Sequence, residues 1–267
     1  MANIQAVFSD LDGTLLNSSH KITPLTAAAI RRLGEIGIPF VPVSGRGPQG
    51  IDLILEGQGL RCPIIAYSGA LMLDEQRRVI FERGMSLGEA RAVVDHLKAR
   101  RFDLTWCAFS AKQWLVPTRE DPRILVEEAI LQTQATPGGL DRLQAGEVVD
   151  KLMCICDPEQ LPAVEADVKA AFPMYTVVPS DRHLLEIMTG GVNKAQAMAQ
   201  FCQLRQLDLR CVAAFGDQYN DLEMLQRAGY GIAMGNAPEP IRRAAGRVTA
   251  DHDHDGVYYA LQALGLA

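Results

Sequence analysis

Short apolar runs recur along the first part of the chain, separated by polar or helix-like stretches. Their β-branched and aromatic residues predict buried strands at residues 6–9, 40–44 and 63–67. Between the first two runs, residues 27–36 carry an apolar stripe with helical spacing. Thr23 and Pro24 predict the start of this helix as N-cap and first-turn proline, and Gly37 predicts its end.

The same alternation returns at the far end of the chain. Apolar runs predict strands at residues 212–216 and 231–234, with helices at residues 195–202 and 222–228. Strands that alternate with helices favour a mostly parallel, Rossmann-like sheet that is buried on both faces. In such α/β sheets, ligands bind beyond the carboxyl ends of the strands.

The middle of the chain has a different pattern, in which strand pairs lie between helices. Helices are predicted at residues 87–98, 127–134 and 161–172, strands at residues 104–107, 113–116, 152–156, 175–178 and 184–187, and a turn at residues 136–139. This pattern favours an α+β module with an open antiparallel sheet. We therefore predict a core domain formed by residues 1–82 and 189–267, with an inserted α+β cap domain at residues 83–188.

Composition narrows the class of protein. The 267 residues are 48% hydrophobic and 22% charged, as in an ordinary globular protein, and the formal net charge is −6. A negative charge argues against a nucleic-acid partner, which would require a basic surface. No apolar stretch has membrane-spanning length, and nothing resembles a signal peptide. We expect a cytoplasmic protein without a membrane partner; its oligomeric state is open.

Several cysteine, tryptophan, histidine and lysine residues could have a chemical role, but for most of them the sequence favours a structural one. The six cysteines are scattered among apolar neighbours, which predicts buried free thiols, and Trp106 and Trp114 are expected to pack in a core. His252 and His254 alternate with aspartates, but a solvated loop is favoured over a transition-metal site. Lys151 could reach a substrate, or it could extend from a strand end into solvent.

Two carboxylates follow directly on the first predicted strand. Asp10 and Asp12 are two residues apart, so their side chains are expected on the same face of an extended segment, where they repel. Gly13 allows a sharp turn immediately afterwards. A nucleophilic carboxylate, a second carboxylate for proton transfer and a hard divalent metal ion would explain this costly arrangement.

Three further polar clusters occupy strand ends or helix starts. Each has an ordinary interpretation as a turn, a cap or a solvated loop, but their joint occurrence in this order is specific. They are Ser44-Gly45-Arg46 after the second strand, Asn193-Lys194 at a helix start, and the loop 216–221 with Asp217, Asn220 and Asp221.

Together these motifs resemble those of the haloacid dehalogenase-like phosphohydrolases. Their order and spacing are similar to the Cof-type sugar-phosphatase branch, which carries a large C2-type cap between its second and third motifs. The resemblance covers nearly the whole chain, although its specificity lies in the four core motifs. It implies a phosphatase acting on small phosphorylated metabolites, with a Rossmann-like core and an inserted cap.

The resemblance also implies roles for individual residues. Asp10 would be the nucleophile that forms an aspartyl-phosphate, and Asp12 would carry the proton. Mg²⁺ would be held by Asp10, Asp217 and the Asp12 carbonyl, and Asp221 would orient one of the metal ligands or a water molecule without binding the metal itself. The transferring phosphoryl group would be held by Leu11, Ser44, Gly45, Lys194 and Asn220.

Two residues that could affect substrate preference depart from the family pattern. Ser68 and His252 stand where family members often carry asparagine, which leaves the chemistry intact but affects expectations about the mouth of the site. Candidates for recognising the substrate are Arg46, Arg182 and His183. The alternatives to a phosphatase are a phosphosugar mutase on the same fold and a catalytically idle metabolite-binding protein.

Overall fold

The chain divides into two compact units. The computed structural model describes residues 3–111, 113–131 and 133–267. One unit, the core unit, comprises Met1–Ile80 and Asn193–Ala267, and the other, the cap unit, comprises Phe81–Val192. Each unit has its own sheet and its own buried apolar residues, and each is described by itself below.

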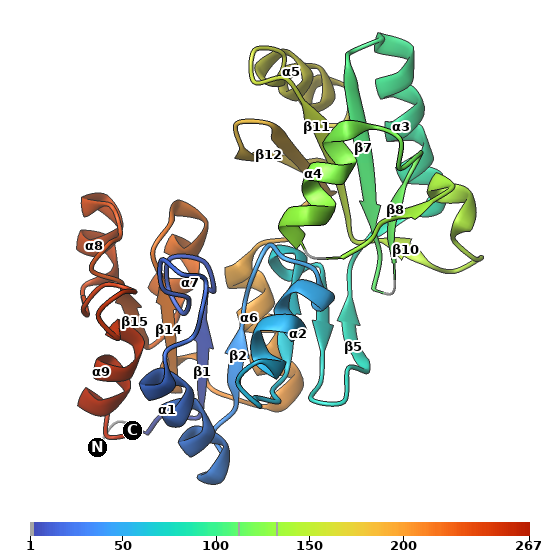
Figure 1. Cartoon of the computed structure of the whole chain (residues 1–267). Coiled ribbons are helices and arrows are strands. Elements are labelled where there is room, and N and C mark those ends of the chain that lie inside the picture. Colours follow the sequence, from blue (N-terminus) through green and yellow to red (C-terminus); the bar gives the residue numbers. More distant parts are fainter. Residues whose placement is uncertain (1–2, 112, 132) are drawn as a thin grey trace. The chain divides into compact units, whose positions relative to one another are not determined.

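The core unit is built on a four-stranded parallel sheet (Figure 1), which confirms the predicted fold class. In spatial order the strands are β15 (Tyr230–Ala233), β14 (Val212–Gly216), β1 (Ala6–Ser9) and β2 (Phe40–Pro42). Nearly every residue of these strands is buried, which explains why they read as continuous apolar runs. A single parallel bridge, Val43 to Ile65, links the sheet to β3 (Ile64–Ala66), which pairs antiparallel with β4 (Leu71–Leu73).

Capping residues fix where the main core helices begin. The hydroxyl of Thr23 accepts the amide of Thr26 at 3.2 Å and starts α1 (Pro24–Glu35), as predicted. Asn193 caps α6 (Lys194–Arg205) in the same way. The other core helices are α2 (Pro48–Glu56), α7 (Leu222–Arg227), α8 (Glu239–Ala245) and α9 (Gly256–Ala263). Among the described residues, no helix has both the length and the apolar character that crossing a bilayer requires.

The cap unit contains a six-stranded sheet of mostly antiparallel pairs. Its order is β12 (Tyr175–Asp181), β13 (Leu184–Thr189), β11 (Lys151–Cys156), β7 (Leu104–Phe109), β8 (Trp114–Val116) and β9 (Thr136–Pro137). Among the described residues of this sheet, only β8 and β9 pair in parallel. The turn predicted at residues 136–139 is therefore wrong for its first two residues, which form an edge strand because they pair with Leu115 and Val116. The other described strands are β5 (Val79–Glu82), which belongs to the sheet of β3 and β4, and the antiparallel pair β6 (Met85–Ser86) and β10 (Val148–Val149).

Two helices cover one face of the cap sheet and form the apolar core of this unit. They are α3 (Leu87–Arg100) and α5 (Leu161–Ala171), and they pack on alternate residues of the strands, Trp106, Cys154 and Cys156 among them. All six cysteines are free thiols, as predicted; five are buried, whereas Cys211 is partly exposed and departs from the prediction. The remaining cap helix, α4 (Pro122–Leu131), begins five residues before its predicted start at Glu127.

The opposite face of the cap sheet holds a buried ion pair. Lys151 Nζ lies 2.7 Å from Glu186 Oε1, and both side chains are nearly inaccessible. The ammonium also lies 5.2 Å from the centre of the Phe109 ring. Lys151 therefore does not extend from a strand end into solvent, one of the two roles considered for it.

Asp150, between β10 and β11, is a buried carboxyl group without a hydrogen-bond partner for either oxygen among the described residues. Burial, with a smaller contribution from Glu82, raises the pKa of Asp150 to about 8. The folded state therefore holds this proton more tightly than the unfolded chain, so its contribution to stability is lost as the pH rises from about 4 to about 8.

We expect Asp150→Asn to raise the free energy of unfolding by about 4 kcal/mol more at pH 9 than at pH 5, because the cost of the buried carboxyl group grows by about 1.4 kcal/mol per pH unit until its raised pKa is reached. The amide keeps the shape of the side chain but cannot ionise. Urea denaturation of both proteins at the two pH values checks this expectation, with the exposed Asp103→Asn as control. An equal effect at both pH values would contradict the explanation by ionisation.

Candidate active site

Two aspartates meet at the carboxyl edge of the core sheet because β1 and β14 are parallel neighbours. Ser9 pairs with Phe215, and the amide of Asp10 donates to the Phe215 carbonyl at 3.0 Å. Asp10 and Asp217 therefore follow the ends of adjacent strands, although they lie 207 positions apart in the sequence. Both side chains are buried, with 6% and 2% of their residue surface exposed. Burial raises the pKa of each carboxyl group above its ordinary range.

Lys194 places a buried ammonium group between two carboxylates. Its Nζ lies 2.6 Å from Asp10 Oδ1 and 2.6 Å from Asp221 Oδ1. The residue is the first of α6, so the Asn193 cap that starts the helix also positions the lysine. Burial alone would lower the pKa of Lys194, but Asp10 and Asp221 reverse this and raise it, so the side chain is a cation.

Hydrogen bonds fix the two aspartates that follow β14. Asp217 Oδ1 accepts the Thr14 hydroxyl at 2.7 Å, and its Oδ2 accepts the Gln218 side-chain amide at 3.1 Å. Asp221 Oδ2 accepts the backbone amides of Asp217 and Gln218 at 3.0 and 2.9 Å. Because backbone amides and Lys194 engage both oxygens of Asp221, this residue shapes the loop and holds the lysine.

The carboxylates of the site suit a hard cation. Asp10, Asp217 and Asp221 each offer an oxygen, and these atoms lie within 4.8 Å of one another. In the described part of the chain, no other group of three such side chains is brought together in this way. Oxygen donors of this kind are those that Mg²⁺ and Ca²⁺ prefer, so the donor set fits a divalent ion.

Asp12 lies apart from this buried cluster. Its carboxylate accepts two hydrogen bonds from Arg46, from Nε at 2.8 Å and from Nη2 at 2.7 Å, and its side chain is 46% exposed. The Asp12 contact raises the pKa of the Arg46 guanidinium. Arg46, considered above as a candidate for recognising substrate, pairs with the second aspartate of the first motif, and 29% of its side chain is exposed.

The second motif is held against the segment that follows β3. The Ser44 hydroxyl is buried and accepts the amide of Arg46 at 3.1 Å, while the Ser44 carbonyl accepts the amide of Ser68 at 2.8 Å. Ser68 has a φ of 55°, in the left-handed region that asparagine adopts more readily than most residues. This backbone conformation is a physical reason for the asparagine often found at this position in the family.

The remaining predicted residues take varied positions. Leu11 is buried and its carbonyl accepts three amides of the turn after β1, whereas Asn220 is exposed in a short 3₁₀ helix. Arg182 and His183 belong to the cap unit, where Arg182 Nε lies 3.0 Å from His183 Nε2.

Side-chain contacts hold the loop of residues 251–255, which contains His252. Ser18 Oγ lies 3.3 Å from His252 Nε2 and also contacts Asp253, while His254 Nδ1 lies 2.6 Å from Asp251 Oδ1. A solvated loop was predicted here. In the structure its imidazoles contact the Ser18 hydroxyl and the carboxylates of neighbouring aspartates.

Two residues of the site have no role predicted from the sequence, although Thr14 belongs to the first motif, residues 10–14. Thr14 bonds Asp217, and the Asn236 side chain donates to the Gly13 carbonyl at 2.8 Å and to Asp217 Oδ2 at 3.4 Å. Asn236 follows β15, and Thr14 follows the aspartate pair. Both therefore continue the pattern of polar residues after strand ends that identified the other motifs.

Comparison with known proteins matches this geometry to a family. The model of haloacid dehalogenase-like hydrolases matches residues 7–261. A putative phosphatase of Haemophilus influenzae is 32% identical over 97% of both chains. A 5-amino-6-(5-phospho-D-ribitylamino)uracil phosphatase of Bacillus subtilis is 26% identical over 98% of both chains.

Solved structures agree with this match. A haloacid dehalogenase-like hydrolase from Bacteroides thetaiotaomicron is 26% identical, covers 98% of this chain and 99% of its own, and superposes with a TM-score of 0.88. The four motifs had predicted the same family from the residues alone. The chain belongs to the haloacid dehalogenase-like hydrolases and is a phosphatase of that family.

Proposed function

We propose that this phosphatase is Mg²⁺-dependent and hydrolyses phosphomonoesters of small metabolites, such as sugar phosphates, through an aspartyl-phosphate intermediate. The observation that carries the proposal is the buried Asp10, which contacts Lys194 and lies beside Asp217 and Asp221. A carboxylate, an ammonium and two further carboxylates within one buried site are the groups that phosphoryl transfer requires.

In the first step, Asp10 attacks the phosphorus atom, so that a bond forms from its carboxylate oxygen while the ester oxygen leaves. Asp12 donates a proton to that leaving oxygen. In the second step, Asp12 takes a proton from water, which attacks the phosphorus and releases inorganic phosphate together with the restored Asp10 carboxylate.

The other residues of the site would hold the phosphoryl group. Lys194 supplies a fixed positive charge, and Ser44, Gly45, Leu11 and Asn220 offer hydroxyl, backbone amide or side-chain amide donors. A bound Mg²⁺ would neutralise charge on the phosphoryl oxygens; Asp10, Asp217 and the Asp12 carbonyl would hold it. Asp221 would act through Lys194 and the loop that it shapes.

The proposed substrate class rests on a relative. The name of the B. subtilis relative describes a phosphorylated ribityl chain, which is a polyol phosphate. We infer that this chain also takes a phosphorylated polyol or sugar, and that Arg182 and His183 of the cap unit contribute to the choice among them.

Release of inorganic phosphate from a panel of sugar, polyol and nucleoside phosphates tests the proposal, with Mg²⁺ and with a chelator. We expect turnover with Mg²⁺, loss with the chelator and recovery when Mg²⁺ is restored. Isomerised sugar phosphate without free phosphate would identify a phosphosugar mutase instead. No turnover of any ester with Mg²⁺ would favour a protein that only binds metabolites.

A separate prediction concerns Arg46, which holds Asp12 through two hydrogen bonds. We expect Arg46→Ala to lower kcat/KM by about 10- to 100-fold, because the proton-carrying carboxylate loses its orientation, and Arg46→Lys to have an intermediate effect. Steady-state kinetics on two substrates checks this, with the exposed Arg32→Ala as control. Unchanged kcat/KM in Arg46→Ala would contradict the role, and unequal losses on the two substrates would also assign Arg46 a part in substrate choice.

A further inference from the structure

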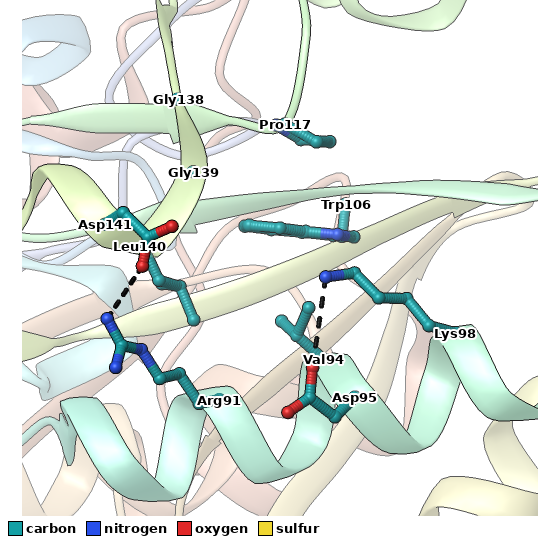
Figure 2. A pocket seen from close by; sticks show the side chains of 10 residues that line it. All are labelled: Arg91, Val94, Asp95, Lys98, Trp106, Pro117, Gly138, Gly139, Leu140 and Asp141. Atoms are coloured by element: carbon teal, nitrogen blue, oxygen red, sulfur yellow. Dashed lines mark hydrogen bonds and ion pairs between the residues drawn. The ribbon is translucent and has the colours of Figure 1, made fainter.

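The cap unit contains a cavity of about 460 Å³ lined entirely by its own residues. The side chains of α3 form one wall, and the opposite wall is formed by Trp106 of β7 together with the segment around Gly138 and Gly139 (Figure 2). This volume lies within the range of pockets that bind small molecules. None of the lining residues is among those placed in the active site above.

The inner part of the cavity is apolar. The indole of Trp106, the Val94 side chain from α3 and the Leu140 side chain lie within it (Figure 2). Gly139 has a φ of +59°, and a Cβ there would lie only 3.1 Å from the Trp106 ring. A larger residue would therefore crowd the indole, so glycine lets this backbone segment pack closely against the Trp106 ring.

Charged side chains of both signs surround the apolar part. Arg91 donates to Asp141 at 2.8 Å, and Lys98 Nζ lies 3.9 Å from Asp95 (Figure 2). All four side chains are at least half exposed. Exposed ion pairs contribute about 1 kcal/mol or less, so a ligand can exchange their partners at little cost.

We propose that this cavity binds a small zwitterion with an apolar side chain, such as a free aromatic or branched aliphatic α-amino acid. The ligand carboxylate would face Arg91, its ammonium would face Asp95, which lies one helical turn further along α3, and its side chain would lie beside Trp106. A ligand with one charge would engage only Arg91 or only Asp95, whereas a zwitterion engages both and leaves their exposed former partners to solvent. The site goes beyond the phosphatase activity, since it shares no residue with the active site.

Fluorescence of Trp106 provides a direct test, because the chain has only two tryptophans. In the Trp114→Phe variant Trp106 is the one remaining indole. We expect L-phenylalanine and L-leucine to change its emission saturably. We expect 3-phenylpropionate and phenethylamine, which each lack one of the two charges, to bind at least about tenfold more weakly, the effect of 1.4 kcal/mol. Calorimetry on the unmodified chain gives the same comparison without any substitution.

Variants on the exposed surface of α3 separate this site from unspecific binding. We expect Arg91→Ala and Asp95→Asn each to weaken L-phenylalanine binding by about tenfold. Arg100→Ala is the matched control, since Arg100 is exposed on the same helix, pairs with Asp167 and does not line the cavity. Absence of saturable binding of both amino acids, equal affinity for 3-phenylpropionate, or an equal loss in the control would overturn the proposal.

Discussion

The Asp10→Asn variant is expected to fold and to lose at least about 10⁴-fold in turnover of any phosphomonoester, as removal of a nucleophile does in other covalent enzymes. The amide has the shape of the carboxylate but is a poor nucleophile. The change also leaves two carboxylates, Asp217 and Asp221, beside the single Lys194 cation. Because the site loses one of three buried negative charges, we do not expect the free energy of unfolding to fall.

Asp12→Asn supplies the informative companion to this experiment. It keeps the nucleophile but removes both the acid of the first step and the base of the second. With p-nitrophenyl phosphate, whose leaving group departs without a proton, only the second step needs Asp12, so phosphorylated Asp10 should accumulate after mixing. Mass spectrometry of the quenched protein should show one added phosphoryl group in Asp12→Asn and none in Asp10→Asn. Turnover by Asp10→Asn within about tenfold of the unmodified enzyme, or a phosphoryl group on another residue, would refute the aspartyl-phosphate mechanism.

Much of the core fold could be predicted from the sequence because its strands are buried on both faces and therefore read as apolar runs. The end of β1 and the end of β14 then supplied the polar residues of the site, Asp10 and Asp217. Helix α2 was not predicted. It starts after Gly47 with no side-chain cap, and Pro48 in its first turn is the one start signal that the sequence carries there.

Side-chain partners were less predictable than element positions. Nothing in the spacing of Asp12 and Arg46 indicates that they form a bidentate pair, since the partners come from different strand ends. The edge strand β9 was likewise read as a turn, because its two residues owe their conformation to pairing with β8 rather than to their own propensity. In both cases a tertiary contact decided what local sequence could not.

Lys194→Met is expected to impair both stability and activity. The thioether has a length similar to that of lysine, but it leaves Asp10, Asp217 and Asp221 buried together without a cation. Removing one partner of a buried ion pair costs about 3–5 kcal/mol, so the free energy of unfolding should fall by roughly that amount. Loss of the charge that faces the phosphoryl group should also lower kcat/KM by at least about 100-fold.

Urea denaturation and steady-state kinetics measure the two effects, and Lys169→Met is the control because Lys169 is exposed and pairs with Glu165 one helical turn away. Mg²⁺ should raise the apparent stability of Lys194→Met, since a ligand that binds only the folded state stabilises it and the uncompensated carboxylates attract a cation. Destabilisation equal to that of the control would mean that Lys194 does not compensate the buried carboxylates. Lost stability with unchanged kcat/KM would show that Lys194 stabilises the folded state but does not act on the phosphoryl group. Its contact with Asp10 would then have a structural role only.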